Sequence, residues 1–258
     1  MSITKGTPLV SIVILTYLHP ELADVCLTTL DITAGVEYEV VVVDNGSGLD
    51  NILRLRAHRD DGRITTLVEE RVNHYFSAGN NLGFRHTNPE SKYILLLNSD
   101  VAFRRSDWLS KFVGWMEGTT EFWPDLWCTH PPEKRGPLDI CSIGWSHQAD
   151  ILPGHARPEG WCYMVRREWW RDLDEDYPMG GGLEHTTAQT IGEGARCGVL
   201  FNYSTYLVHK EQGSSEPGAE IPNYAQAPAV GAWFSAVAPC LTLDFVLGDD
   251  EHGSYVNW

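Results

Sequence analysis

The sequence predicts an α/β domain with a mostly parallel central sheet flanked by helices. Apolar, β-branched runs of strand length alternate with helical segments over the first hundred residues, and the connections between them are short. These runs are almost continuously apolar, which is typical of strands that are buried on both faces. Strands joined by helices are parallel, and right-handed crossovers place the helices on the faces of the sheet.

The first half of the chain follows this pattern element by element. The run LVSIVILTY predicts the first strand, and Pro20 after it suits the first turn of a helix. The same strand and helix step repeats twice before a fourth strand, KYILLLNSD. The predicted strands are 9–17, 38–47, 63–70 and 92–100, and the predicted helices are 20–33, 51–59 and 77–87.

The regular alternation weakens after residue 105. SDWLSKFVGWME predicts a helix, whereas residues 120–160 are rich in Trp, Pro, His and Gly and show no clear period. WCYMVRR then predicts a strand, and REWWRDL starts a short helix. A further helix is predicted over 183–196 and a strand over 197–210. We expect these elements to form a smaller subregion beside the sheet.

The net charge of −16 over 258 residues excludes several classes of partner. Such a surface repels the phosphates of nucleic acid, and no stretch is rich in Lys or Arg, so we expect no nucleic-acid partner. Anionic membrane surfaces are disfavoured for the same reason. To bind an anionic substrate, the protein would need local positive charge against this negative potential, and a bound divalent cation can supply it.

The apolar runs and the cysteines indicate in which cellular compartment the protein is expected. No apolar run approaches the roughly 20 residues that cross a bilayer, and no secretory signal is visible at the start, so we expect no transmembrane segment. The six cysteines are scattered without a CxxC spacing, which disfavours a zinc site and is typical of buried reduced thiols. A cytoplasmic location fits both observations.

Polar residues follow three of the predicted strands at the point where each strand ends. These strand ends are Thr16–Tyr17, Asp44–Ser47 and Asn98–Asp100. The carboxyl ends of parallel strands meet at one edge of a sheet, where ligands bind in open α/β folds. The alternative is that they are only turn residues, because loops are polar in any case. Two of the three ends carry an aspartate, which favours a binding site.

Four motifs follow one another in the first half, namely VSIVILTY, EVVVVDNGSGLDN, NHYFSAGNNLGF and YILLLNSDVAF. In order and spacing they resemble family 2 glycosyltransferases of the GT-A, Rossmann-like fold, and most of all the rhamnosyltransferase-like branch. The resemblance covers residues 9–103, is weaker over 160–210 and ends near 213. It implies a metal-dependent, inverting transfer of a hexosyl or deoxyhexosyl group from a UDP- or dTDP-sugar to a glycan or another hydroxyl acceptor.

The resemblance also implies a domain organisation. We expect a glycosyltransferase domain at 1–212, with a nucleotide-sugar-binding half at 1–105 and an acceptor and catalytic half at 106–212. Residues 213–258 match nothing in the family, and we expect them to pack on this domain as an extension or to form a dimer contact, which leaves a homodimer open.

Two other functions compete with sugar transfer. A nucleotidyltransferase would show a Gly-rich loop with a Lys or Arg after the first strand to hold a triphosphate, and LTYLHPEL has neither. The second alternative is a degenerate, non-catalytic transferase that binds nucleotide sugars or carbohydrate. Its main support is a histidine at a position where the family has an acid.

The family's donor site maps onto the strand ends and the GNN segment. By resemblance, Asp44 contacts the pyrimidine base, and Thr16 or Tyr17 lines the base pocket. Asn98 replaces the first acid of the family's D-x-D-like triplet, so its amide can hydrogen-bond the ribose but adds no charge. The donor-binding residues implied are Thr16, Tyr17, Asp44, Asn45, Gly79, Asn80, Asn81, Asn98 and Ser99.

The resemblance makes Asp100 and His209 the protein ligands of Mn²⁺ or Mg²⁺. Asp100 is the last residue of the triplet, and His209 ends a later strand at the family's spacing. Such a cation stabilises the charge of a diphosphate leaving group and takes further oxygen ligands from diphosphate and water. By residue type alone, a lone histidine after an apolar strand is more often a surface or core residue than a ligand.

An inverting transfer also needs a base to take the proton of the acceptor hydroxyl. GGGLEHTTAQTIGEGAR resembles the family helix that opens with an acidic pair, and here the pair is Glu184–His185. We predict Glu184 as the base, since the glycines before it permit close approach of a substrate. His185 is the alternative, because imidazole titrates near neutral pH. A third interpretation makes Glu184 only a first-turn acid favoured by the helix dipole.

The acceptor is expected to lie against residues 120–165. The strand WCYMV resembles the family element that carries the acceptor loop. The acceptor-binding residues implied are Trp161, Cys162 and Gly182. Between them, Asp174–Asp176 predict a solvated acidic turn, with an acceptor contact as the alternative.

Overall fold

The computed structural model describes residues 7–119, 126–128, 140–145, 159–178, 181–193, 195–200 and 206–209. The predicted extension at 213–258 and most of 120–160 lie outside the described residues, so the predicted domain limits stay predictions. Among the residues described, no helix is long and apolar enough to cross a membrane.

The amino-terminal half consists of parallel strands joined by helices, as predicted. Its elements are β1 (Val10–Thr16), α1 (Pro20–Leu30), β2 (Tyr38–Asp44), α2 (Leu49–Asp60), β3 (Thr66–Glu69), α3 (Tyr75–Arg85) and β4 (Tyr93–Asn98). The strand order is β3-β2-β1-β4, and all of these pairs are parallel. Thr16 pairs with Asp44 and Leu15 with Asn98, so the polar strand ends share one edge of the sheet.

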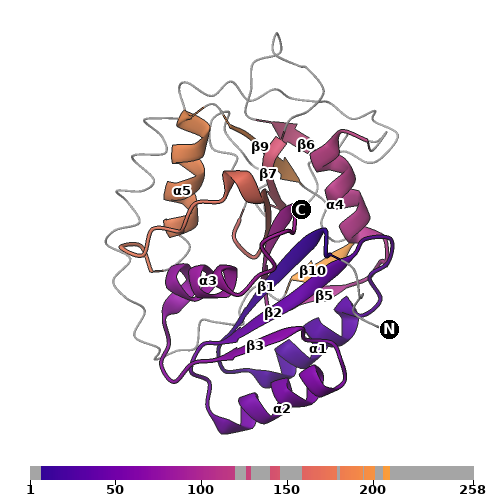
Figure 1. Cartoon of the computed structure of the whole chain (residues 1–258), viewed down its shortest axis with the longest axis vertical. Helices are drawn as coiled ribbons and strands as arrows, with labels where there is room; N and C mark the ends of the chain where they lie inside the picture. Colours follow the sequence, from indigo (N-terminus) through magenta and orange to yellow (C-terminus); the bar gives the residue numbers. More distant parts are fainter. Residues whose placement is uncertain are drawn as a thin grey trace, which may run out of the picture.

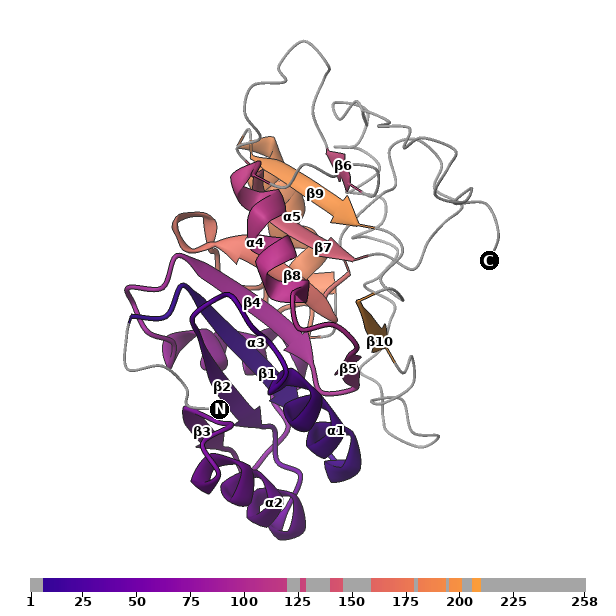
Figure 2. The ribbon, with the colours of Figure 1, turned by 90° about the vertical axis from the view of Figure 1, so that its right-hand side faces the viewer.

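The rest of the sheet is mixed. Its elements, with those around it, are β5 (Val101–Phe103), α4 (Trp108–Glu117), β6 (Leu126–Cys128), β7 (Ile140–Trp145), β8 (Cys162–Arg166), α5 (Gly181–Gly192), β9 (Arg196–Leu200) and β10 (Leu207–His209). β8 runs antiparallel to β4, and the eight-stranded sheet continues through β7 and β9 to β6. β5 and β10 form a separate antiparallel pair, with β5 beside α1 (Figure 2).

Three expectations need correction. β6 and β7 lie in the segment where no strand is predicted, because β7, with the sequence ICSIGW, mixes small and polar residues with apolar ones although it is fully buried. The short helix predicted from Arg167 is only a three-residue 3-10 turn. The single strand predicted over 197–210 is two strands, β9 and β10, which belong to different sheets.

Helices cover both faces of the sheet (Figure 1). Ile12 and Ile14 of β1 belong to the larger core cluster, together with residues of α1 and α4. Val13 points to the opposite face and belongs to a second cluster, where Phe84 of α3 and Leu183 of α5 also pack. α3 and α5 therefore lie on the same face of the sheet, which brings their first turns together.

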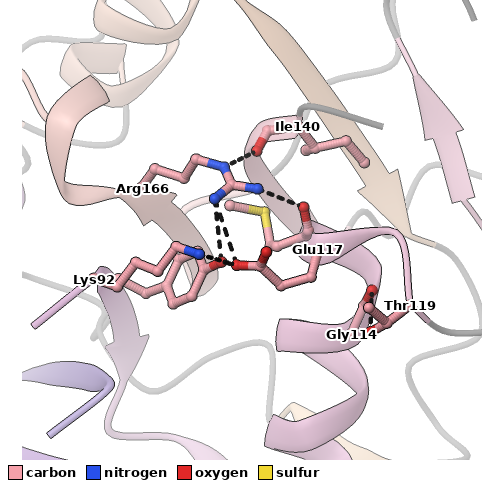
Figure 3. A network of polar contacts seen from close by, with 8 residues as sticks. Lys92, Gly114, Glu117, Thr119, Ile140 and Arg166 are labelled. Atoms are coloured by element: carbon pink, nitrogen blue, oxygen red, sulfur yellow. Dashed lines mark hydrogen bonds and ion pairs between the residues drawn. The ribbon is translucent and has the colours of Figure 1, made fainter. Parts of the chain in front are cut away.

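A buried arginine joins α4 to the mixed part of the sheet (Figure 3). Arg166 is 7% exposed and donates from Nη2 to the Met116 carbonyl at 2.7 Å and from Nε to the Ile140 carbonyl at 2.8 Å. Its Nη1 lies 3.5 Å from Glu117 Oε1, which also pairs with Lys92. The guanidinium thus satisfies two buried carbonyls that belong to different elements.

Candidate active site

Three loops meet at the carboxyl edge of the parallel strands, and hydrogen bonds join them. After β1, the Leu18 N–H donates at 2.8 Å to Ser47 Oγ, which lies in the loop after β2. Asn45 reaches the third loop, because its Oδ1 accepts the His74 N–H at 2.8 Å and its Nδ2 donates to Asn73 Oδ1 at 2.7 Å. Asn45 is 1% exposed, so these bonds are shielded from water. The predicted donor edge is therefore one bonded unit.

Asp44 ends β2 beneath these loops and is fully buried. Its Oδ2 accepts the Ser47 N–H at 3.2 Å, and its Oδ1 accepts a hydrogen bond from Asn51 of α2. Thr16 Oγ1 lies 3.5 Å from Oδ1, and Tyr17, the next residue, is half-buried. The carboxylate thus holds the loop that leads into α2. Its contact with a nucleobase stays a prediction.

Left-handed backbone marks the rim of this edge. Leu18, His19 and Tyr75 have positive φ angles of 54°, 46° and 60°, which cost a non-glycine residue about 1 kcal/mol or more. Gly46 also has a positive φ of 84°, and an added Cβ there would lie 2.7 Å from the carbonyl carbon of Val72. Strained backbone of this kind gathers at ligand sites.

The GNN segment predicted to pass close to the donor lies in α3, where its residues contact protein groups. An added Cβ on Gly79 would lie 2.6 Å from Leu15 Cδ1, so the helix packs directly on β1. Asn80 is 2% exposed and donates to the Phe76 carbonyl at 2.8 Å within its own helix. Asn81 is fully buried as well. A donor contact of these residues stays a prediction.

Asn81 bonds to the segment that precedes α5. Its Nδ2 donates to the Leu173 carbonyl and to Glu175 Oε1, each at 2.9 Å, and its Oδ1 accepts the Leu173 N–H at 2.7 Å. The amide therefore binds both backbone groups of the residue before Asp174. Sequence reasoning missed this contact, because no motif or spacing links α3 to the acidic turn.

Asp100 and His209 meet where β5 pairs with β10. Val101 stands opposite His209 in the antiparallel ladder, which brings the residue before it, Asp100, beside the imidazole. His209 Nε2 lies 3.3 Å from Asp100 Oδ1, and each side chain is 9% exposed. Ser99, predicted at the donor, is half-buried beside them. The two residues predicted as metal ligands are thus close neighbours.

This pair fits a divalent cation that takes only part of its shell from protein. Two ligands at right angles and about 2.1 Å from an octahedral cation lie about 3 Å apart, close to the 3.3 Å found. A carboxylate oxygen and an imidazole nitrogen both suit Mn²⁺. The residues that the structure describes include no group of three or more His, Cys, Asp or Glu that could hold a metal.

Trp161 covers the histidine of this pair. Its ring stacks on His209 with centroids 4.5 Å apart and an interplanar angle of 8°. The Trp161 carbonyl accepts the Asn98 N–H at 2.8 Å, which ties the start of β8 to the end of β4. Cys162 is fully buried, and burial raises the pKa of its thiol above the ordinary range. Both residues support the site from the core, and their contact with an acceptor stays a prediction.

His185 in α5 has a carboxylate partner. Its Nδ1 lies 2.6 Å from Asp174 Oδ2, and its ring meets Tyr177 at a centroid distance of 5.5 Å. Its Nε2 lies 3.4 Å from the Nε2 of Gln189, one turn further along. The sequence predicts a solvated turn at Asp174, whereas the structure gives this carboxylate a specific partner. Glu184 lies in the first turn of α5, but its side chain is outside the described residues.

Gly182 is wedged between α3 and the segment that carries Asp174. An added Cβ would clash with Ser77 Oγ and would lie 2.5 Å from the Asp174 carbonyl. Ser77 in turn donates from Oγ to the Tyr177 carbonyl at 2.7 Å and from its N–H to the Pro178 carbonyl at 3.0 Å. Glycine is thus needed here for close packing, while the predicted acceptor contact stays untested.

A series of contacts connects α5 to the Asp100–His209 pair. An added Cβ on Gly160 would lie 3.1 Å from Leu183 Cδ2, so the first turn of α5 lies against the residue before Trp161. Trp161 stacks on His209. The candidate bases and the candidate metal ligands are therefore linked through Leu183, Gly160 and Trp161 at one edge of the sheet.

Part of the sequence matches a known protein family, and the fold is similar to those of several solved structures. The family model described as Glycosyl transferase family 2 matches residues 11–129. No curated protein matches the sequence. Among solved structures, the chain is similar to the mannosyltransferase PcManGT from Pyrobaculum calidifontis in complex with GDP-Man and Mn²⁺, with a TM-score of 0.59, 15% identity and coverage of 92% of this chain and 74% of that one.

Structures of S. aureus TarS 1–349 are similar as well. The complex with UDP-GlcNAc has a TM-score of 0.56 at 12% identity, covering 92% of this chain and 68% of that one. The complex with UDP has a TM-score of 0.53 at 14% identity, covering 77% and 59%. At these identities the structural likeness shows the fold alone.

The predicted fold is confirmed, since the mostly parallel sheet flanked by helices is that of GT-A glycosyltransferases. The family match covers β1 to β6, which includes the three bonded loops and Asp100. The chain is therefore a glycosyltransferase with a GT-A fold, and its residues 11–129 match the family 2 model.

Proposed function

We propose that this glycosyltransferase moves a sugar from a nucleoside diphosphate donor to a hydroxyl acceptor, with inversion and with the help of a divalent cation. The observation that carries the proposal is the Asp100–His209 pair, 3.3 Å apart, at the edge where three hydrogen-bonded loops meet. Solved structures of the same fold hold GDP-Man with Mn²⁺, UDP and UDP-GlcNAc, which supports this donor class.

Within that class we favour a UDP- or dTDP-sugar, on the resemblance of the sequence to the rhamnosyltransferase-like branch. The loops that Asn45 and Ser47 hold together would bind the nucleoside. Asn98 and Ser99, at the end of β4, would face the ribose and the diphosphate. The shared edge of the sheet and the hydrogen bonds between the loops support these roles.

Asp100 and His209 would hold Mn²⁺ or Mg²⁺. When bound, this cation supplies positive charge against the diphosphate as the glycosidic bond breaks. α5 carries the candidate bases, and the base takes the proton of the acceptor hydroxyl as its oxygen attacks the anomeric carbon. A single displacement of this kind inverts that carbon.

A thermal-shift screen with UDP, dTDP and GDP, each with and without Mn²⁺, tests the proposal. Bound ligand raises the melting temperature by mass action. We expect the largest shift when nucleotide and Mn²⁺ are both present, and we expect Asp100→Asn to remove the Mn²⁺-dependent part. Asp60→Asn, at a 70% exposed side chain on α2, is the matched control. An equal Mn²⁺ response in both variants would contradict the metal role.

Turnover separates an active transferase from a chain that only binds its donor. Release of UDP from UDP-GlcNAc, or of GDP from GDP-Man, is measured with Mn²⁺ present and water as the acceptor. We expect release with at least one donor. Nucleotide binding without any release from a panel of UDP-, dTDP- and GDP-sugars would support the degenerate, non-catalytic alternative.

A further inference from the structure

His185 and Asp174 form a histidine–carboxylate pair of defined polarity. The distance of 2.6 Å between His185 Nδ1 and Asp174 Oδ2 is that of a strong, charge-assisted hydrogen bond. An ionised carboxylate can only accept, so Nδ1 carries the proton. Nε2 is then the unprotonated nitrogen, which can accept a proton. The amide nitrogen of Gln189, a hydrogen-bond donor, lies 3.4 Å from it. The ring therefore presents a basic nitrogen away from Asp174.

Asp174 is itself held from two directions. Its Oδ1 accepts the Asp176 N–H at 3.0 Å, so the second oxygen of the carboxylate is fixed within the turn. The residue before it, Leu173, is 3% exposed and is bound through both backbone groups by Asn81 of α3. A base that is oriented by a third, fixed group is the arrangement that nucleophile activation uses in enzymes.

The pair also lies at the edge where the donor loops meet. α5 begins against Ser77, which is in the first turn of α3, and α3 follows the loop that Asn45 binds. The side chains of His185 and Asp174 are 23% and 28% exposed, so a substrate can reach the imidazole. The titratable groups described around the ring are Asp174 and Tyr177, both from the segment before α5, while Gln189 on its own helix is neutral.

We propose that His185 is the general base of the transfer and that Asp174 is its positioning residue. This inference deepens the proposed function and rests on it. Nε2 takes the proton of the acceptor hydroxyl while the hydroxyl oxygen forms its bond to the anomeric carbon. The bond from that carbon to the diphosphate oxygen breaks, and its electron pair leaves with the diphosphate. Asp174 keeps the ring in one tautomer and stabilises the imidazolium that forms.

The assignment replaces the sequence-based preference for Glu184, and it can be tested variant by variant. His185→Gln, Asp174→Asn and Glu184→Gln are compared with Asp172→Asn, a control in the same segment with a 61% exposed side chain. The readout is Mn²⁺-dependent release of nucleotide from UDP-GlcNAc, a dTDP-sugar or GDP-Man, with water as the acceptor. The thermal shift produced by nucleotide with Mn²⁺ is recorded for every variant.

We expect His185→Gln to lower kcat at least about 100-fold, as is typical when a general base is lost. Its nucleotide-dependent thermal shift should equal that of the wild type, and its loss should exceed that of Glu184→Gln at least tenfold. Asp174→Asn should lower kcat about 10- to 100-fold, with KM and the nucleotide-dependent thermal shift unchanged. A residue that only supports the fold would change KM and the thermal shift as well.

His185→Asp provides a positive test, since it restores the acid that the family has at this position. It should recover activity relative to His185→Gln, with the acid limb of its pH–rate profile at lower pH because carboxylates titrate below imidazole. Wild-type kcat in His185→Gln, an equal or larger loss in Glu184→Gln, or wild-type kcat in Asp174→Asn would overturn the dyad. A wild-type protein with no nucleotide-dependent shift would overturn the proposed function, and the dyad with it.

Discussion

Replacing Asn81 by alanine separates two roles for the GNN segment. The sequence predicts a donor contact, whereas the structure shows a fully buried amide that binds the N–H and the carbonyl of Leu173 at 2.7 and 2.9 Å. Asn81→Ala leaves two buried backbone groups without these bonds, at about 1–3 kcal/mol each. The third bond, to the exposed Glu175, is worth little. The higher helix propensity of alanine offsets up to about 0.7 kcal/mol of this cost, so we expect a net loss of about 1–5 kcal/mol.

Urea unfolding measures this loss, and Asn80→Ala is the matched control, because Asn80 is buried and donates to the Phe76 carbonyl in its own helix. We expect a change of about 1 kcal/mol or less in the control. Asn81→Ala should also slow turnover, since the segment that carries Asp174 is loosened, while the nucleotide-dependent thermal shift is retained. A loss below about 1 kcal/mol combined with weaker nucleotide binding would show that Asn81 acts at the donor instead.

Two further predictions concern the core. Arg166→Met leaves the Met116 and Ile140 carbonyls without this donor, so we expect the free energy of unfolding, measured in urea, to fall by about 2–4 kcal/mol. A change within about 0.5 kcal/mol would show that the network in Figure 3 does not stabilise the fold. Burial, followed by the charge of Asp100, raises the pKa of Cys26 from 9.0 to about 12. Between these two pKa values the folded chain keeps a proton that the unfolded chain loses. The thiol therefore lowers the free energy of unfolding by about 1.4 kcal/mol for each pH unit of increase. Urea unfolding at a series of alkaline pH values should show that the free energy of unfolding falls less steeply with pH in Cys26→Ala than in the wild type.

The polar edge of the sheet could be predicted from the sequence because its signals are local. Each strand of the parallel half is a continuous apolar run that stops at polar residues, so strand position and strand end are visible in a short window. Parallel pairing then brings Thr16, Asp44 and Asn98 to one edge without further information. Asp100 and His209 are distant in sequence and are brought together by the pairing of β5 with β10. In the sequence, only the spacing shared with the resembled family indicates that they are close.

The surroundings of the base could not be predicted, because they depend on contacts between segments with no shared pattern. Asn81 and Leu173 are 92 residues apart, and neither the helix period nor a motif connects them. Asp174 lies in a run of acids that is typical of a solvated turn, yet α5 folds back over it because Gly182 permits contact with Ser77. β7 escaped detection because its buried residues include cysteine, serine and glycine, which do not mark a strand.

The two departures from the family's acidic motifs act in the same direction. Asn98 stands where the family's triplet has an acid, and His185 stands where its helix has the second acid of a pair. Each replaces an acid by a residue without a negative charge, in a chain whose net charge is −16. Repulsion of the diphosphate is reduced, but the cation loses a charged partner, so nucleotide and Mn²⁺ should each bind more tightly in the presence of the other. The carboxylate that supports the base is retained at Asp174, one hydrogen bond away from His185.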